Sequence, residues 1–238
     1  MDNESQKTQS GNYMLPASVV VAGLMISASI IYLVGSKNAP ARVEAPAGGG
    51  QLAAVGGGPT EIGERDAVLG DPGAPVTVIE YGDFQCPFCA RFHSQVGERL
   101  REEYIAEGKV KMVFRNFQFL GPESTAAAEA AECAKDQGKF WAFHDAIYDE
   151  ETRDGREHNG NLNRDFFVRT AQALDLNAGD FSSCIDSGKY AAQVAADTEA
   201  ASAVGVNSTP TTYINGRLVR GAVPYEQFKA VIEEELNK

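Results

Sequence analysis

The chain has few histidines, few cysteines and no cluster of basic residues. Its 238 residues include 21 Lys and Arg against 33 Asp and Glu, for a formal net charge of -12. Because phosphate binding relies on a basic surface, this charge argues against a nucleic-acid partner. Only four cysteines occur, and a zinc site built from four cysteines usually needs two close pairs, whereas this chain has one. The two scarcities therefore argue against nucleic-acid binding and against a structural zinc site.

The one close pair, in the motif Cys86-Pro87-Phe88-Cys89, is the most informative feature that is present. It follows an apolar run over 76–81, rich in β-branched residues, which predicts a buried strand, and it precedes a helical pattern. Unpaired N–H groups at a helix start stabilise a thiolate, the nucleophile of thiol–disulfide exchange. The motif therefore predicts a redox-active pair, although a lone C-x-x-C is also half of a zinc site.

An uncharged apolar stretch lies near the N-terminus, after a short tail over 1–14. It predicts a transmembrane anchor over 15–35, because a helix over its central 19 residues, 16–34, spans about 29 Å, close to the hydrocarbon thickness of a bilayer. A cleaved signal peptide is the alternative, but its apolar core is typically about 7–15 residues and follows a basic leader. The leader here is not basic.

The orientation of this anchor is predicted from redox chemistry. The flanking charges of Lys7, Lys37 and Arg42 give no support for an outside C-terminus and slightly oppose it. A stable disulfide-forming domain belongs in an oxidising compartment. We therefore expect residues 36–238 on the extracytoplasmic side of a bacterial cytoplasmic membrane, with the Gly-, Ala- and Pro-rich residues 36–60 as a flexible linker.

The folded domain is expected over 61–238. Its pattern predicts a strand over 76–81, a helix over 86–106 and a second strand over 110–114. A helical insertion over about 122–204 follows, then a strand over 211–214 and a final helix from 225 onward. A strand, helix and strand in this order indicate a βαβ unit with a parallel sheet. Asn215-Gly216 predicts a tight hairpin turn after the later strand.

This layout resembles the DsbA-like thiol:disulfide oxidoreductases, and more closely their membrane-tethered bacterial branch. The blocks that carry the resemblance are 80–89, 132–141 with His144-Asp145, and 205–216. The resemblance covers about residues 66–236. It implies an α/β thioredoxin fold with an inserted helical domain.

The resemblance also implies roles for the four residues of the motif. Cys86 matches the exposed attacking cysteine, and Cys89 matches the buried resolving partner. Pro87 and Phe88 match the pair that tunes the redox potential. The most oxidising members have a histidine in place of Phe88, so we expect this chain to be a weaker oxidant than they are.

Three further residues match positions around the disulfide. Pro210 matches a proline whose preceding peptide bond is cis, which would place the Thr209 backbone where an extended substrate can pair with it. An ordinary trans-proline turn is the alternative. Glu80 matches a buried acid that could relay a proton to Cys89 if its pKa is raised. Its alternative is an outward-pointing glutamate at a strand edge.

The remaining cysteines, Cys133 and Cys184, lie in the expected helical insertion. Some relatives have a second disulfide at similar places, and unpaired thiols are a liability in an oxidising compartment, so we predict a structural bond between them. Two independent buried cysteines are the alternative. His93, one turn beyond Cys89, could influence the thiolate or simply pack, and for His144 we expect packing.

Together these features predict a monomeric enzyme that introduces disulfide bonds into reduced exported proteins. The resemblance implies a membrane redox partner for reoxidation, and the chemistry needs no metal or organic cofactor. The first alternative is a reductase or isomerase of the same fold. A redox-inactive peptide-binding chaperone and a zinc-binding structural domain are the others.

Overall fold

The computed structural model describes residues 52–53, 57–154 and 156–238. The predicted tail over 1–14, the anchor over 15–35 and the first part of the linker over 36–60 lie outside these ranges. Within the described ranges, no helix is long and apolar enough to cross a membrane.

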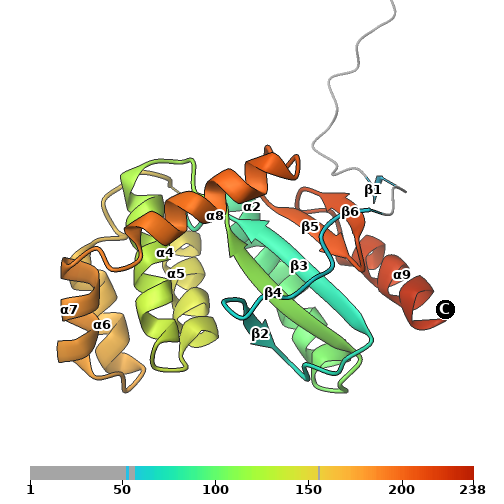
Figure 1. The fold of residues 1–238 in the computed structure, drawn as a ribbon, viewed down its shortest axis with the longest axis horizontal. Helices are drawn as coiled ribbons and strands as arrows, with labels where there is room; N and C mark the ends of the chain where they lie inside the picture. The colour runs from blue at the N-terminus through green and yellow to red at the C-terminus, as the bar shows by residue number, and fades with distance from the viewer. Residues whose placement is uncertain (1–51, 54–56, 155) are drawn as a thin grey trace, which may run out of the picture. The chain divides into compact units, whose positions relative to one another are not determined.

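A six-stranded sheet with the strand order β1-β6-β5-β3-β4-β2 forms the centre of the domain (Figure 1). Its strands are β1 Leu52–Ala53, β2 Ala67–Leu69, β3 Val76–Gly82, β4 Val110–Asn116, β5 Thr211–Ile214 and β6 Arg217–Arg220. The predicted parallel pair is β3 and β4, which run in register from Val76 opposite Val110 to Gly82 opposite Asn116. Every residue of β3 is buried, as expected for a strand covered on both faces.

Helices cover both faces of this sheet and also gather beside it (Figure 1). They are α2 Pro87–Phe92, η1 His93–Gly97, α3 Glu98–Leu100, η2 Arg101–Ile105, α4 Pro122–Lys135, α5 Phe140–Asp154, α6 Arg164–Ala173, α7 Ala178–Asp186, α8 Ala191–Ala203 and α9 Tyr225–Leu236. The run from α2 to η2 packs with α9 on one face of the sheet, where Phe92, Leu100 and Phe228 are fully buried. On the other face, Ala201 of α8 packs in a cluster with Ile79 of β3.

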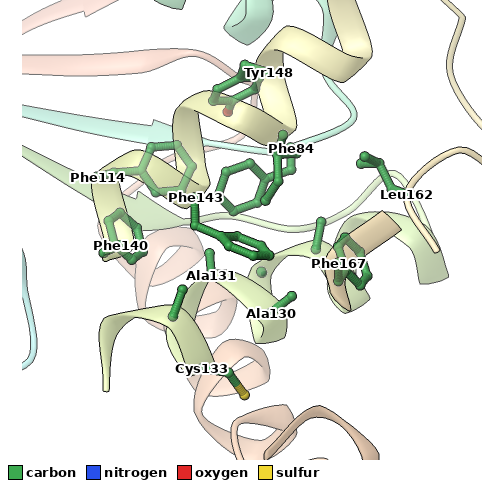
Figure 2. Close-up of a cluster of buried hydrophobic side chains, with 14 of the residues drawn as sticks. Phe84, Phe114, Ala130, Ala131, Cys133, Phe140, Phe143, Tyr148, Leu162 and Phe167 are labelled. Carbon is green, nitrogen blue, oxygen red and sulfur yellow. The ribbon is translucent and has the colours of Figure 1, made fainter. Parts of the chain in front are cut away.

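The helical insertion has its own core, which joins that of the sheet. Ala127, Ala130 and Ala131 of α4 are fully buried, and their small side chains let neighbouring helices approach closely. Figure 2 shows Ala130 and Ala131 beside the aromatic rings of this core, among them Phe143. A disulfide bond joins Cys133 of α4 to Cys184 of α7. The predicted α/β thioredoxin fold with a helical insertion is confirmed.

One segment differs from its prediction as a flexible linker. Leu52 and Ala53 pair antiparallel with Val219 and Leu218 of β6, and the N–H of Gly58 donates to the carbonyl of Gly216 at 3.1 Å. Without this segment the edge of β6 would present unpaired backbone groups. The end of the glycine-rich linker therefore lies against the sheet. Its side-chain composition did not predict this, because backbone groups make these contacts.

Candidate active site

Cys86 and Cys89 lie where β3 gives way to α2, at the carboxyl end of the central parallel pair. Cys86 is the N-cap residue of α2 and Pro87 is at its first turn. Proline is favoured there because its missing N–H would have had no partner inside the helix. Both cysteines are unbonded. Cys89 is fully buried, as expected, but the expectation of an exposed Cys86 is wrong: it is only 5% exposed, because the Thr209 backbone lies 3.5 Å from its sulfur.

The pKa values of the two thiols are shifted in opposite directions. A hydrogen bond from the Cys89 thiol, helped by the backbone N–H groups of Cys89 and Phe88, lowers the pKa of Cys86 to about 7, although burial opposes this shift. Burial raises the pKa of Cys89 well above its usual value, and its hydrogen bond to Cys86 adds to that effect. Cys86 is therefore the thiol that ionises first and can attack or be attacked.

We predict that alkylation of the reduced protein by iodoacetamide reaches half its maximal rate near pH 7, the pKa of Cys86. Because folding lowers this pKa from 9.0 to about 7, the ionised thiol stabilises the reduced fold fully above about pH 9. That stabilisation is lost as the pH falls through 7. A half-maximal rate near pH 9.0, the pKa that the thiol has without these contacts, would contradict the assignment.

Cys89 has no exposed surface and a raised pKa, and the other two cysteines are bonded to each other, so the alkylation reports on Cys86. The matched control is Cys86→Ser, which should remove the rapid alkylation at every pH.

Glu80 lies beneath the two cysteines, on the central strand β3. It is 1% exposed, and its neighbours in register are Phe114 of β4 and Thr212 of β5. Burial raises the pKa of its carboxyl well above the usual range, and the negative charge of the Cys86 thiolate raises it further, whereas Arg101 lowers it. Glu80 is thus a buried acid in the middle of the sheet, with a raised pKa, and does not point outward from an edge.

The Thr209–Pro210 peptide bond is cis. Thr209 is buried, and its carbonyl oxygen lies 3.5 Å from the sulfur of Cys86, which donates to it. Although 123 positions separate the two residues in the chain, the fold brings this backbone to the reactive sulfur. Phe88, by contrast, is 51% exposed at the surface of the motif, with the guanidinium of Arg91 over its ring at 4.8 Å.

Asp83, which the sequence analysis did not single out, holds the loop that carries Cys86. Its backbone carbonyl accepts from the N–H of Cys86 at 3.0 Å. Its buried carboxylate accepts from the N–H groups of Phe119 and Leu120 at 2.9 and 3.0 Å and from the hydroxyl of Ser124. An Asp just after a buried strand is a signal of such a loop contact.

A second group of polar residues lies between the run α2–η2 and α5. The two oxygens of Asp145 accept from Arg101 at 2.5 and 2.7 Å, and one of them also lies 2.8 Å from Nδ1 of His144. Burial lowers the pKa of His144 to about 4, so the ring is neutral at pH 7, and it packs edge-on to Tyr148. The prediction that His144 packs is therefore confirmed.

His93, His144 and Asp145 together offer three potential ligand atoms within 4.8 Å of one another. A cation there would compete with the guanidinium of Arg101 for the same two carboxylate oxygens. The donor set therefore fits an ion-pair network better than a metal centre, and we assign no metal to it.

The fold and this cysteine pair define a thiol:disulfide oxidoreductase. A family model described as thioredoxin matches residues 63–234. The chain is 35% identical over 173 residues to the probable disulfide bond formation protein D of Bacillus anthracis, covering 71% of this chain and 78% of that protein. This chain therefore belongs to the thioredoxin family, in the same DsbA-like branch as the Bacillus anthracis protein.

Solved structures agree with that placement. The crystal structure of oxidised BdbD from Bacillus subtilis superposes with a TM-score of 0.69 and 29% identity, over 77% of this chain and 98% of BdbD. The structure of α-DsbA1 from Wolbachia pipientis gives 0.64 and 26%, over 72% and 91% of the two chains.

Proposed function

We propose that this chain introduces disulfide bonds into exported proteins, by thiol–disulfide exchange at Cys86 and Cys89. The observation that carries the exchange chemistry is the split between the two thiols, since the pKa of Cys86 is lowered to about 7 and that of Cys89 is raised. The direction of exchange is supported by the relatives, which are named for disulfide bond formation.

The proposed reaction starts from the Cys86–Cys89 disulfide. A substrate thiolate attacks the sulfur of Cys86, so that a mixed disulfide forms while the bond to Cys89 breaks and Cys89 leaves with the electron pair. The protonated carboxyl of Glu80 supplies a proton to the Cys89 thiolate and is reprotonated from solvent. A second substrate thiolate then attacks the mixed disulfide, which releases oxidised substrate and leaves the Cys86–Cys89 pair reduced.

The substrate backbone is proposed to lie along Thr209 and Pro210. The Thr209 carbonyl lies 3.5 Å from the Cys86 sulfur, so an extended substrate pairing there as an added strand has its cysteine close to Cys86. Pro87 starts the helix beside the reactive sulfur, and Phe88 presents an exposed ring. Neither can donate a hydrogen bond to the thiolate from its side chain, which agrees with a weaker oxidant than the members that have histidine there.

The proposed setting is the extracytoplasmic face of a bacterial membrane, with the segment over 15–35 as the anchor. Substrates there are reduced exported proteins, and a redox partner in the membrane reoxidises the Cys86–Cys89 pair. The domain is proposed to act as a monomer.

One observation keeps a reductase as the second candidate. The pKa of Cys86 is about 7, which is the value of thioredoxin (about 7) and well above that of DsbA (about 3.5). A less stabilised thiolate makes the disulfide less oxidising, because the potential follows the relative stability of the reduced form.

We predict that the Cys86–Cys89 couple of the full chain, equilibrated with glutathione, has a potential between about -180 and -120 mV. This is the range in which a disulfide is readily donated, below the strongest oxidants of the family. The bonded pair Cys133–Cys184, followed by mass, serves as the internal control that should stay oxidised. A potential near about -270 mV would make the disulfide the stable state and would move the assignment to the reductase.

A further inference from the structure

Glu80 is the ionisable group on which the proposed proton transfer depends, and one of its two cross-strand neighbours is polar. Phe114 of β4 lies on one side of it, and on the other side the antiparallel pairing of β3 with β5 sets Thr212 directly opposite. Residues opposite each other on antiparallel strands point to the same face, with Cβ atoms about 4.5–5.5 Å apart. The register therefore places the side chain of Thr212 beside that of Glu80.

The pair lies on the face of the sheet that α2 covers. Val78 and Ile214 are opposite each other two positions along the same two strands, and both belong to the apolar cluster formed with the helical run that starts at α2. Side chains alternate between the faces along a strand, so residues two positions apart share a face. Glu80 and Thr212 are therefore on the side of the sheet from which α2 presents Cys89.

Both side chains of this pair have a buried oxygen without a partner. Glu80 is 1% exposed and Thr212 is 0% exposed. The Oε1 of Glu80 and the hydroxyl of Thr212 make no hydrogen bond to any of the described residues. The adjacent Thr211 differs, because its hydroxyl donates to the carbonyl of Ser208 at 2.7 Å. A buried hydroxyl without a partner is unfavourable, so the hydroxyl of Thr212 lowers the stability of this state unless another state uses it.

The proposed exchange supplies such a state. When the carboxyl of Glu80 gives its proton to the Cys89 thiolate, a negative charge is left in the interior of the sheet. A neutral carboxyl tolerates an apolar environment far better than a carboxylate, which needs hydrogen-bond donors there. A threonine hydroxyl has one proton to donate and rotates to suit its acceptor. The hydroxyl of Thr212 is a free donor at the position where this charge forms.

We infer that Thr212 is a positioning residue for the disulfide exchange, whose hydroxyl donates a hydrogen bond to the Glu80 carboxylate once the proton has moved to Cys89. When Glu80 takes a proton back from solvent, the hydroxyl is released. Thr212 acts on the exchange only through Glu80. This inference rests on the proposed function, because it assigns Thr212 to the proton step of that reaction.

The test is the titration of Glu80 in the reduced full chain, followed by the infrared carbonyl band of its protonated carboxyl. Glu80→Gln identifies the band by removing it. Thr212→Val keeps the branched shape of threonine and removes the hydroxyl. It should strengthen proton binding by Glu80 about tenfold, because the hydrogen bond is lost from the carboxylate and not from the neutral acid. Thr212→Ser, which keeps a hydroxyl, should bind the proton as the unmodified chain does.

Thr211→Val is the matched control. It removes a buried hydroxyl from the same strand, at the neighbouring position that faces the other side of the sheet, and it should leave the titration of Glu80 unchanged. The other ionisable groups that interact electrostatically with Glu80 are the same in all these variants: Cys86, Cys89, Arg101 and Tyr148. A shift confined to Thr212→Val therefore reports the hydroxyl.

Urea unfolding provides a second measurement. While Glu80 is protonated, the hydroxyl of Thr212 has no partner among the described residues, so Thr212→Val should be at least as stable as the unmodified chain. Thr211→Val should be less stable, because the carbonyl of Ser208 loses its donor.

Three results would overturn the inference. They are a titration of Thr212→Val within about twofold of the unmodified chain, weaker proton binding in that variant, or a loss of its stability while Glu80 is protonated. The titration needs no substrate, so its outcome is separate from that of the proposed function. A chain that fails to oxidise reduced peptides while Thr212→Val shifts as expected would refute the function and leave the hydrogen bond to Glu80 intact.

Discussion

Replacing Cys86 with serine is expected to lower the rate of disulfide formation in a reduced peptide to the uncatalysed background, a loss of at least about a thousandfold. A hydroxyl in place of the sulfur cannot form the mixed disulfide that the reaction passes through. Its proton is also held far more tightly than that of a thiol whose pKa is lowered to about 7. The measurement is the rate of oxidation of a two-cysteine peptide by the preoxidised full chain.

Cys89→Ser is the informative partner variant. It keeps the low-pKa thiol of Cys86 but removes the fully buried thiol beside it. This variant should also fail to turn over, yet unlike Cys86→Ser it should form a stable adduct with disulfide-bonded peptides that mass spectrometry detects. Full oxidase activity in Cys86→Ser, or a trapped adduct on that variant, would contradict the proposed roles.

The second large effect is expected from the disulfide of the helical insertion. The bond joins α4 to α7 across a sequence separation of 51, and a loop of that length corresponds to about 4 kcal/mol of stabilisation in the chain-entropy treatment. Cys133→Ala/Cys184→Ala should therefore lower the free energy of unfolding by about this amount. Urea unfolding followed by circular dichroism measures the change.

A suitable control for this experiment is Cys86→Ala/Cys89→Ala, which removes the other cysteine pair and should not reproduce the loss. The double variant in the insertion should retain the low pKa of Cys86, because the hydrogen bonds that lower it come from Cys89, Thr209 and the start of α2, all outside the insertion. A loss of stability below about 1 kcal/mol would show that the helices of the insertion hold together without the bond.

Local sequence was enough for several parts of the fold. Asn215 and Gly216 both have positive φ, of 45° and 81°, as the predicted tight turn requires. In the helical run predicted after Cys86, apolar residues recur every four positions, and these residues, Phe92, Val96, Leu100 and Tyr104, are buried in the core. These features depend on backbone preference and on hydrophobic periodicity, both of which can be read from neighbouring residues.

The end of the linker shows where local sequence was insufficient. Glycine, alanine and proline predicted a flexible segment over 36–60, yet Leu52 and Ala53 pair with β6. The pairing uses backbone groups that every residue has, and its existence depends on an edge strand formed more than 160 positions later. Composition alone does not report such a partner.

By itself, the sequence determined the class of chemistry in this protein: two cysteines at a strand-to-helix turn, an acid within a buried strand and a proline ahead of a hairpin. The tertiary structure decided the energetics of the site. It places the Thr209 carbonyl beside Cys86, buries Glu80 without a hydrogen-bond partner for its Oε1 among the described residues, and pairs Arg101 with Asp145. Proton affinities depend on burial and on distances between groups far apart in the chain, and folding alone fixes those distances.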